Sequence, residues 1–199
     1  VPVKKSALGG AVPGDKVRFS LAYTAKGELT ARVETIYGSA DSARICADAI
    51  IDSAGIPHVF PAEVLAEAES LRERGISDRE RENREDLREW CIFTIDGRDA
   101  KDLDDAVSLE RKGDGWLLGV HIADVSHYVT AGSALDREAM KRGTSVYFAD
   151  RVIPMLPEAL SNGLCSLGAG EDKLTLSALI GLDSQGKMIS FQFNKSVIR

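Results

Sequence analysis

Five aspartates stand within ten positions of the stretch TIDGRDAKDLDDAV, at residues 94–107: Asp96, Asp99, Asp102, Asp104 and Asp105. Two unit charges 4 Å apart repel by about 1 kcal/mol in water and by about 4 kcal/mol at an effective dielectric of 20. A cluster of this kind is tolerated either because its side chains spread into solvent or because a cation binds among them. Carboxylate oxygens are hard ligands, which suit Mg²⁺ or Mn²⁺ better than zinc.

The residues on both sides of the cluster favour the cation over an acidic surface loop. The cluster follows the apolar run at residues 91–95 and precedes the apolar sequence AVSL. It is therefore attached to a core at both ends. In an extended chain Asp102 and Asp104 share one side while Asp105 points to the other, so a turn or bulge is needed to bring all three together.

Two known acidic motifs do not match. An EF-hand loop starting at Asp102 needs Gly where Val107 stands and a closing Glu where Gly113 stands. A phosphatase with an aspartyl nucleophile needs a second acid two residues after Asp96, where the sequence has Arg98. What remains is a carboxylate site for one or two Mg²⁺ ions that handle phosphate.

The composition is that of an ordinary globular chain. Its 199 residues are 44% hydrophobic and 28% charged, which allows one core or one core with a smaller satellite domain. No apolar run approaches a membrane span, no signal peptide is recognisable, and three scattered cysteines offer no zinc motif. We therefore expect a cytoplasmic protein with no membrane partner. The net charge of −6 argues only weakly against a nucleic-acid partner.

Three regions of the chain differ in pattern. Residues 1–39 alternate apolar and polar side chains and predict two strands joined by a turn at residues 25–27. Residues 40–90 predict helices that end at Gly55 and Gly75. The last part of this region, SDRERENREDLREW, is nearly all charged, and we interpret it as a solvated helix face or connector. A regulatory or partner-binding segment is the alternative.

Residues 91–199 alternate strands with short helices, which indicates an α+β fold. We predict the following elements: a strand at 91–96, a hairpin over 106–129 that turns at 112–115, a helix between Ser133 and Gly143, a bent segment with a short helix after Pro154, and a second hairpin that turns at 184–186.

Four segments in this order resemble the catalytic RNB domain of the RNase II / RNase R family: TIDGRDAKDLDDAV, HIADVSHYV, LDREAMKRGTSVYF and VIPMLPEALSNGLCSL. They are more similar to the RNase R type than to the RNase II type. Members are processive 3′→5′ exoribonucleases that release nucleoside 5′-monophosphates. The resemblance implies three parts: the end of an OB-type, cold-shock-like domain at 1–39, a helical charged connector at 40–90, and the N-terminal part of the RNB domain at 91–199.

The family's pattern of catalytic aspartates, D-x5-D-x-D-D, falls on Asp96, Asp102, Asp104 and Asp105. Asp99 lies outside it. By resemblance the four carboxylates hold Mg²⁺, which Mn²⁺ can replace, and Asp96 and Asp105 are direct ligands. The implied reaction is attack on phosphorus by a metal-activated water.

Tyr147 in the segment TSVYF matches the family's tyrosine that stacks on the 3′-terminal base of single-stranded RNA. Such stacking contributes about 1–3 kcal/mol with any base. In the family a catalytic arginine and a terminal RNA-binding domain lie beyond the position that matches Arg199. We therefore expect these 199 residues to be a truncated fragment that is inactive or barely active alone. The alternatives are a non-catalytic RNA-binding or interaction module on the same scaffold and a generic Mg²⁺-dependent phosphatase.

Other polar residues have a structural interpretation or an open role. His121 and Asp124 are an odd number apart on a predicted strand and should face opposite sides. We interpret His121 as structural. Asp124 is a candidate for a residue that contacts the metal ligands without binding the metal itself. Cys165 is predicted to be a small buried residue. Three basic residues on the helix before Tyr147 are candidate contacts to RNA phosphates: Arg137, Lys141 and Arg142.

Overall fold

A computed structural model describes Val1 and residues 3–199 of the chain. The chain divides into two compact units, one formed by Val1–Val59 with Val146–Ile153 and the other by Phe60–Ser145 with Pro154–Arg199. Among the residues that the structure describes, no helix is long and apolar enough to cross a membrane.

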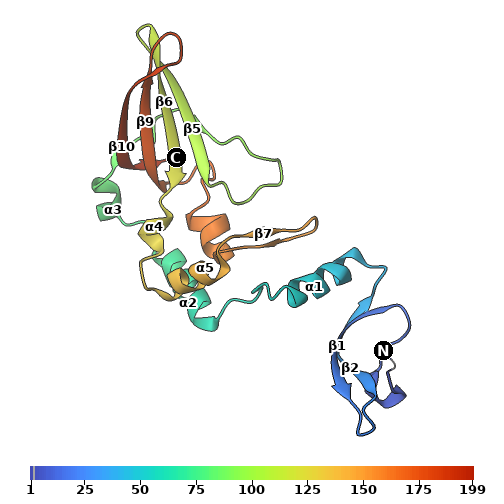
Figure 1. The fold of residues 1–199 in the computed structure, drawn as a ribbon. Coiled ribbons are helices and arrows are strands. Elements are labelled where there is room, and N and C mark those ends of the chain that lie inside the picture. The colour runs from blue at the N-terminus through green and yellow to red at the C-terminus, as the bar shows by residue number, and fades with distance from the viewer. Residues whose placement is uncertain (2) are drawn as a thin grey trace. The chain divides into compact units, whose positions relative to one another are not determined.

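The first unit is built on an antiparallel pair of strands (Figure 1), β1 (Asp15–Tyr23) and β2 (Leu29–Ser39). Gly27 in the turn between them has φ of 78°, which favours glycine over residues with a side chain. The two predicted strands and their turn are thus confirmed. A short helix η1 (Lys5–Ala7) precedes them, and α1 (Ala43–Ser53) follows.

A small hairpin from later in the chain belongs to the same unit. It consists of β7 (Val146–Tyr147) and β8 (Val152–Ile153). Arg151, between the two strands, lies 2.6 Å from a carboxylate oxygen of Asp48 on α1. This ion pair attaches the hairpin to the helix.

The second unit contains a six-stranded sheet in the order β3-β10-β9-β6-β5-β4. Its strands are β3 (Glu85–Asp86), β4 (Ile92–Phe93), β5 (Asp105–Lys112), β6 (Gly115–Ala123), β9 (Lys173–Leu182) and β10 (Met188–Ile198). All neighbours are antiparallel except β3 and β10, which run parallel. Both predicted hairpins, β5–β6 and β9–β10, are confirmed with their turns.

Helices gather at the end of the sheet where β6 ends (Figure 1). The helices of this unit are α2 (Ala62–Arg74), α3 (Asp78–Glu82), α4 (Val125–Tyr128), α5 (Ala134–Arg142) and the π-helix η2 (Leu160–Leu164). The predicted caps of α5 are present, because Ser133 accepts a hydrogen bond from the Asp136 amide and Gly143 is left-handed. Large side chains in the common core include Leu87, Tyr128, Leu135, Leu160 and Leu174, all at most 2% exposed.

Two predicted strands are too long. The strand expected at 91–96 is reduced to Ile92–Phe93, because the chain leaves the sheet edge there and Ile95 is 81% exposed. Asp96 therefore lies on a loop. The strand expected to run to Val129 ends at Ala123, because the next residues form the turn of α4, in which the His127 amide donates to the Asp124 carbonyl at 3.0 Å.

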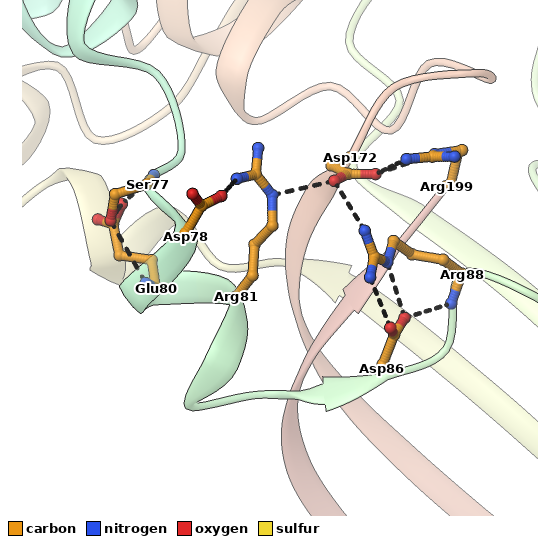
Figure 2. A network of polar contacts seen from close by, with 8 residues as sticks. All are labelled: Ser77, Asp78, Glu80, Arg81, Asp86, Arg88, Asp172 and Arg199. Carbon is orange, nitrogen blue, oxygen red and sulfur yellow. Dashed lines mark hydrogen bonds and ion pairs between the residues drawn. The ribbon is translucent and has the colours of Figure 1, made fainter.

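The charged segment at residues 77–90 is not one solvated helix, because β3 within it pairs with β10 of the sheet. Only five of its residues form a helix, α3. Figure 2 shows the carboxylate of Asp172, which directly precedes β9, accepting from Arg81 at 3.0 Å, Arg88 at 3.3 Å and Arg199 at 2.9 Å. Asp172 is only 13% exposed in its side chain, so these contacts are partly shielded from solvent.

Candidate functional site

The aspartate cluster lies where the chain enters the sheet from the β4–β5 loop. Asp96, Asp102 and Asp104 are on the loop, and Asp105 is the first residue of β5, paired with Ile122 of β6. The cluster is therefore continuous with the central strands of the second unit, as the flanking apolar sequence predicted.

Ser166 anchors the loop on both sides of Asp102. Its hydroxyl donates to the Lys101 carbonyl at 2.7 Å and accepts from the Leu103 amide at 3.2 Å. The Leu167 amide donates to the Leu103 carbonyl at 2.9 Å, and the Leu103 side chain packs against the core. These contacts fix the backbone that carries Asp102 and Asp104. Ser166 belongs to the sequence segment SNGLCSL that carries the family resemblance, although the sequence alone did not single it out.

Three neighbouring carboxylates act on Asp104. Asp104 is exposed as a residue, but its carboxyl group is partly enclosed by protein, and this raises its pKa; repulsion from Asp102, Asp105 and Asp96 raises the pKa further. Asp99 does not contribute to this shift. The three carboxylates that repel the charge on Asp104 are the other three of the family pattern.

The chemistry of this donor set fits a hard divalent cation, because several carboxylates concentrate negative charge that a cation would neutralise. Over residues 1 and 3–199, no group of three or more His, Cys, Asp or Glu side chains is already arranged to hold a metal ion. Octahedral Mg²⁺ needs oxygen ligands at about 2.0–2.1 Å, so the carboxylates would have to move closer together around the ion.

Asp124 lies just beyond the end of β6, and its partner is Arg84. Their charged atoms are 2.6 Å apart, and the two side chains are 4% and 3% exposed. Burial raises the pKa of Asp124, but hydrogen bonds from Arg84 and Ser126 outweigh burial and lower it below its usual value. Sequence reasoning missed Arg84 because it precedes Asp124 by 40 positions and stands among many other charged residues.

His121 and Cys165 are both buried, as their structural interpretations predicted. The two ring nitrogens of His121 contact the hydroxyls of Ser108 and Ser177, and burial lowers the pKa of His121 to about 4. Cys165 is 2% exposed, and burial is the main cause that raises its thiol pKa to about 12.

The basic residues of α5 have different surroundings. The Arg142 side chain is only 2% exposed, its guanidinium lies 3.6 Å from the centre of the Phe60 ring, and it donates to Glu138 at 2.9 Å. Arg142 is therefore part of the interior and its candidacy as an RNA contact is wrong. Arg137 and Lys141 are exposed.

Tyr147 lies on β7, in the first unit, and is 64% exposed. An aromatic ring with this exposure offers a face on which a base can stack. Its proposed contact with RNA rests on the resemblance of the segment TSVYF.

The family model described as "RNB domain" matches residues 84–199, more than half of the chain. The chain belongs to the RNB family. A second model, "Cold shock domain", matches residues 1–61. The predicted fold class, a cold-shock-type β domain followed by an α+β RNB domain, is confirmed, and so is the family resemblance.

Known relatives of this RNB family chain are considerably longer. It is 47% identical over 197 residues to Ribonuclease R of Thermotoga maritima, covering 96% of this chain and 28% of that protein. Mycoplasma genitalium RNase R, solved with ribose-methylated single-stranded RNA, has a TM-score of 0.85 at 29% identity over 99% of this chain and 31% of its own. Yeast Ssd1, a pseudonuclease, shares the fold with a TM-score of 0.70 at 19% identity, covering 98% of this chain and 25% of its own.

Proposed function

We propose that the aspartate cluster is the catalytic centre of a Mg²⁺-dependent, processive 3′→5′ exoribonuclease that hydrolyses RNA to nucleoside 5′-monophosphates. The observation that carries this proposal is that Asp102, Asp105 and Asp96 all raise the pKa of Asp104, on a loop before β5 that Ser166 anchors. The name of a relative supports it, because a protein 47% identical to this chain is called Ribonuclease R.

The four carboxylates would hold Mg²⁺, or Mn²⁺ in its place: Asp96, Asp102, Asp104 and Asp105. When bound, the ion activates water for attack and stabilises the leaving oxygen. The protein's own contribution is to hold the acids on an anchored loop, so that their repulsion makes the site receptive to a cation. Asp105, fixed by its pairing with Ile122, and Asp96 are proposed as direct ligands.

The proposed substrate is the 3′ end of single-stranded RNA. Tyr147 would stack on the terminal base, and stacking tolerates every base because each has an aromatic face. The solved complex of Mycoplasma genitalium RNase R with single-stranded RNA supports this substrate class. We further propose that residues 1–39, 40–90 and 91–199 serve as the barrel end, connector and catalytic parts of a cytoplasmic enzyme.

Ssd1 supplies the observation that favours a second candidate, a non-catalytic RNA-binding module. Its fold likeness to this chain shows that the fold by itself does not establish hydrolysis, since Ssd1 is a pseudonuclease. The four aspartates favour the enzyme, because a binding module has no need to concentrate carboxylates beside RNA phosphates, which they repel.

The test is Asp104→Asn in a chain extended to the length of the curated relatives. We expect Mg²⁺-dependent RNA cleavage to be lost while RNA binding is retained. Asp99→Asn is the matched control, because it removes a charge from the same loop outside the family pattern, and it should cleave normally. Unchanged cleavage by Asp104→Asn would contradict the assignment. The 199 residues alone span 28% of the Thermotoga maritima protein and 31% of the Mycoplasma genitalium chain, and we expect them to trim RNA barely or not at all.

A further inference from the structure

The ion pair between Arg84 and Asp124 is unusually well buried for a pair of charges. Nη2 of Arg84 donates to Oδ2 of Asp124 at 2.6 Å, and both side chains are at most 4% exposed. Apolar residues of similar volume often replace such a pair with no loss of stability, because the charges must be removed from water. A contribution to stability is therefore a weak explanation for the presence of a buried ion pair at this position.

Both partners are fixed by further hydrogen bonds. Nη1 of Arg84 donates to the Thr175 carbonyl of β9 at 3.1 Å. The second carboxylate oxygen of Asp124 accepts from the Ser126 hydroxyl at 2.9 Å, and its backbone amide donates to the Leu174 carbonyl at 2.9 Å. Asp124 is thus held by a side chain from the segment before β3, by its own turn and by β9.

The residue before Asp124 connects this arrangement to the aspartate cluster. The Ala123 amide donates to the carbonyl of Asp104 at 3.0 Å, and Ile122 pairs with Asp105. Since Ala123 and Asp124 share a peptide bond, a displacement of Asp124 moves the donor that holds the Asp104 backbone. The connection from Arg84 to Asp104 therefore consists of one ion pair, one peptide link and one hydrogen bond.

We infer that the Arg84–Asp124 pair is a positioning device for the aspartate cluster, by which the segment before β3 sets the backbone of Asp104. This inference rests on the proposed function, because it assigns the pair to the same site. Arg84 and Asp124 act through Ala123 and are positioning residues, not ligands.

The test uses the double variant Arg84→Met/Asp124→Leu in the 199-residue chain without metal. Asp124→Leu leaves the Arg84 charge buried without its carboxylate, and Arg84→Met leaves Asp124 with only the more distant, exposed Lys195 at 3.9 Å. Each single variant should therefore unfold at a lower urea concentration, whereas the double variant should recover the midpoint of the parent. Amide hydrogen exchange at Ala123, followed by NMR, should nevertheless be at least tenfold faster in the double variant. Exchange at Ala123 equal to that of the parent would overturn the inference.

Arg84→Lys provides a variant that keeps the charge. The single ammonium group of lysine cannot donate to both Asp124 and the Thr175 carbonyl in the way that the two terminal guanidinium nitrogens of Arg84 do. We expect this variant to fold. The rate of amide hydrogen exchange at Ala123 should lie between the rates in the parent and in the double variant. Parent-like exchange in Arg84→Lys would also count against the positioning role.

Mg²⁺ binding separates this inference from the proposed function. Loss of an outer partner typically weakens metal affinity by about 10–100-fold, and we expect a fall of this size in the double variant by calorimetry. Arg72→Met, which removes an arginine whose ion pair with Glu69 is exposed and lies within α2, should bind Mg²⁺ as the parent does. Equal affinity in the parent and the double variant would overturn the inference. A parent chain that binds no Mg²⁺ would contradict the proposed metal site instead, and Ala123 exchange would then decide the inference by itself.

Discussion

Nδ1 of His121 lies 2.7 Å from the hydroxyl of Ser177, across two paired strands in the middle of the sheet. The other ring nitrogen lies 3.0 Å from the Ser108 hydroxyl on β5. Ser177 in turn contacts the Ser196 hydroxyl at 2.5 Å on β10. These side chains therefore form a continuous series of hydrogen bonds across β5, β6, β9 and β10. Each has a hydrogen-bond partner, as buried polar groups require.

This arrangement predicts a loss of stability in mild acid. His121 takes up a proton near pH 6.5 when unfolded but only near pH 4 when folded, because burial opposes its charge. Between these values the unfolded chain binds more protons, so the free energy of unfolding falls as the pH falls, by about 3 kcal/mol in total. Urea unfolding measured from pH 7 to pH 4 should show this decline.

His121→Gln is the control for the acid effect, because the amide group can form hydrogen bonds and does not titrate. The variant should be less stable at pH 7 but should lose less stability than the parent between pH 6.5 and pH 4. An identical pH dependence in both proteins would show that His121 is not the group responsible.

Gly119 makes room for the His121 hydrogen bond to Ser108. A methyl group at Gly119 would overlap the Ser108 hydroxyl and lie 2.7 Å from Nε2 of His121. We expect Gly119→Ala to lower the free energy of unfolding by about 1–3 kcal/mol through overpacking. Gly168→Ala, where the added methyl meets nothing within 4 Å, should stay close to the parent in the same urea titration. Equal effects of the two substitutions would contradict the packing described.

Cysteine labelling should report the burial of Cys165. The thiolate is the reactive form, and a buried thiol with a pKa of about 12 supplies almost none at pH 8. Iodoacetamide followed by mass spectrometry should modify exposed Cys91 in the folded chain and Cys165 only after unfolding. Labelling of both at similar rates would show that the region around Cys165 opens readily.

Ser166→Ala tests the loop anchor. It leaves the Lys101 carbonyl and the Leu103 amide without the hydroxyl to which both are hydrogen-bonded. Loss of a hydrogen-bond partner of this kind lowers the free energy of unfolding by about 1–3 kcal/mol. Since the same contacts fix Asp102 and Asp104, we expect Mg²⁺ affinity to fall by about tenfold or more. Ser161→Ala, on an exposed hydroxyl of η2 that contacts Asn162, is the matched control. Calorimetry giving equal affinities for the two variants would contradict a role for the anchor.

The sequence predicted those features whose signals are local. The caps Ser133 and Gly143 bounded α5, and alternating apolar residues located both hairpins. Each of these signals lies within a few residues of the structure that it specifies.

The features that the sequence did not predict depend on contacts between residues that are far apart in the chain. Arg142 is interior because Phe60, which comes 82 positions earlier, covers its guanidinium. The charged segment binds the sheet because Arg81 and Arg88 meet Asp172. Charge alone could not distinguish these arginines from solvated ones, because the choice depends on which carboxylates the fold brings near them.

The central claim is that the aspartate cluster hydrolyses RNA from its 3′ end. The direct measurement uses single-stranded RNA labelled in its 3′-terminal nucleotide, incubated with Mg²⁺ and a chain extended to the length of the relatives. We predict that the label appears first as a nucleoside 5′-monophosphate, and that Asp104→Asn abolishes its release. Release of internal fragments first, or hydrolysis of small phosphate esters with indifference to RNA length, would contradict the account.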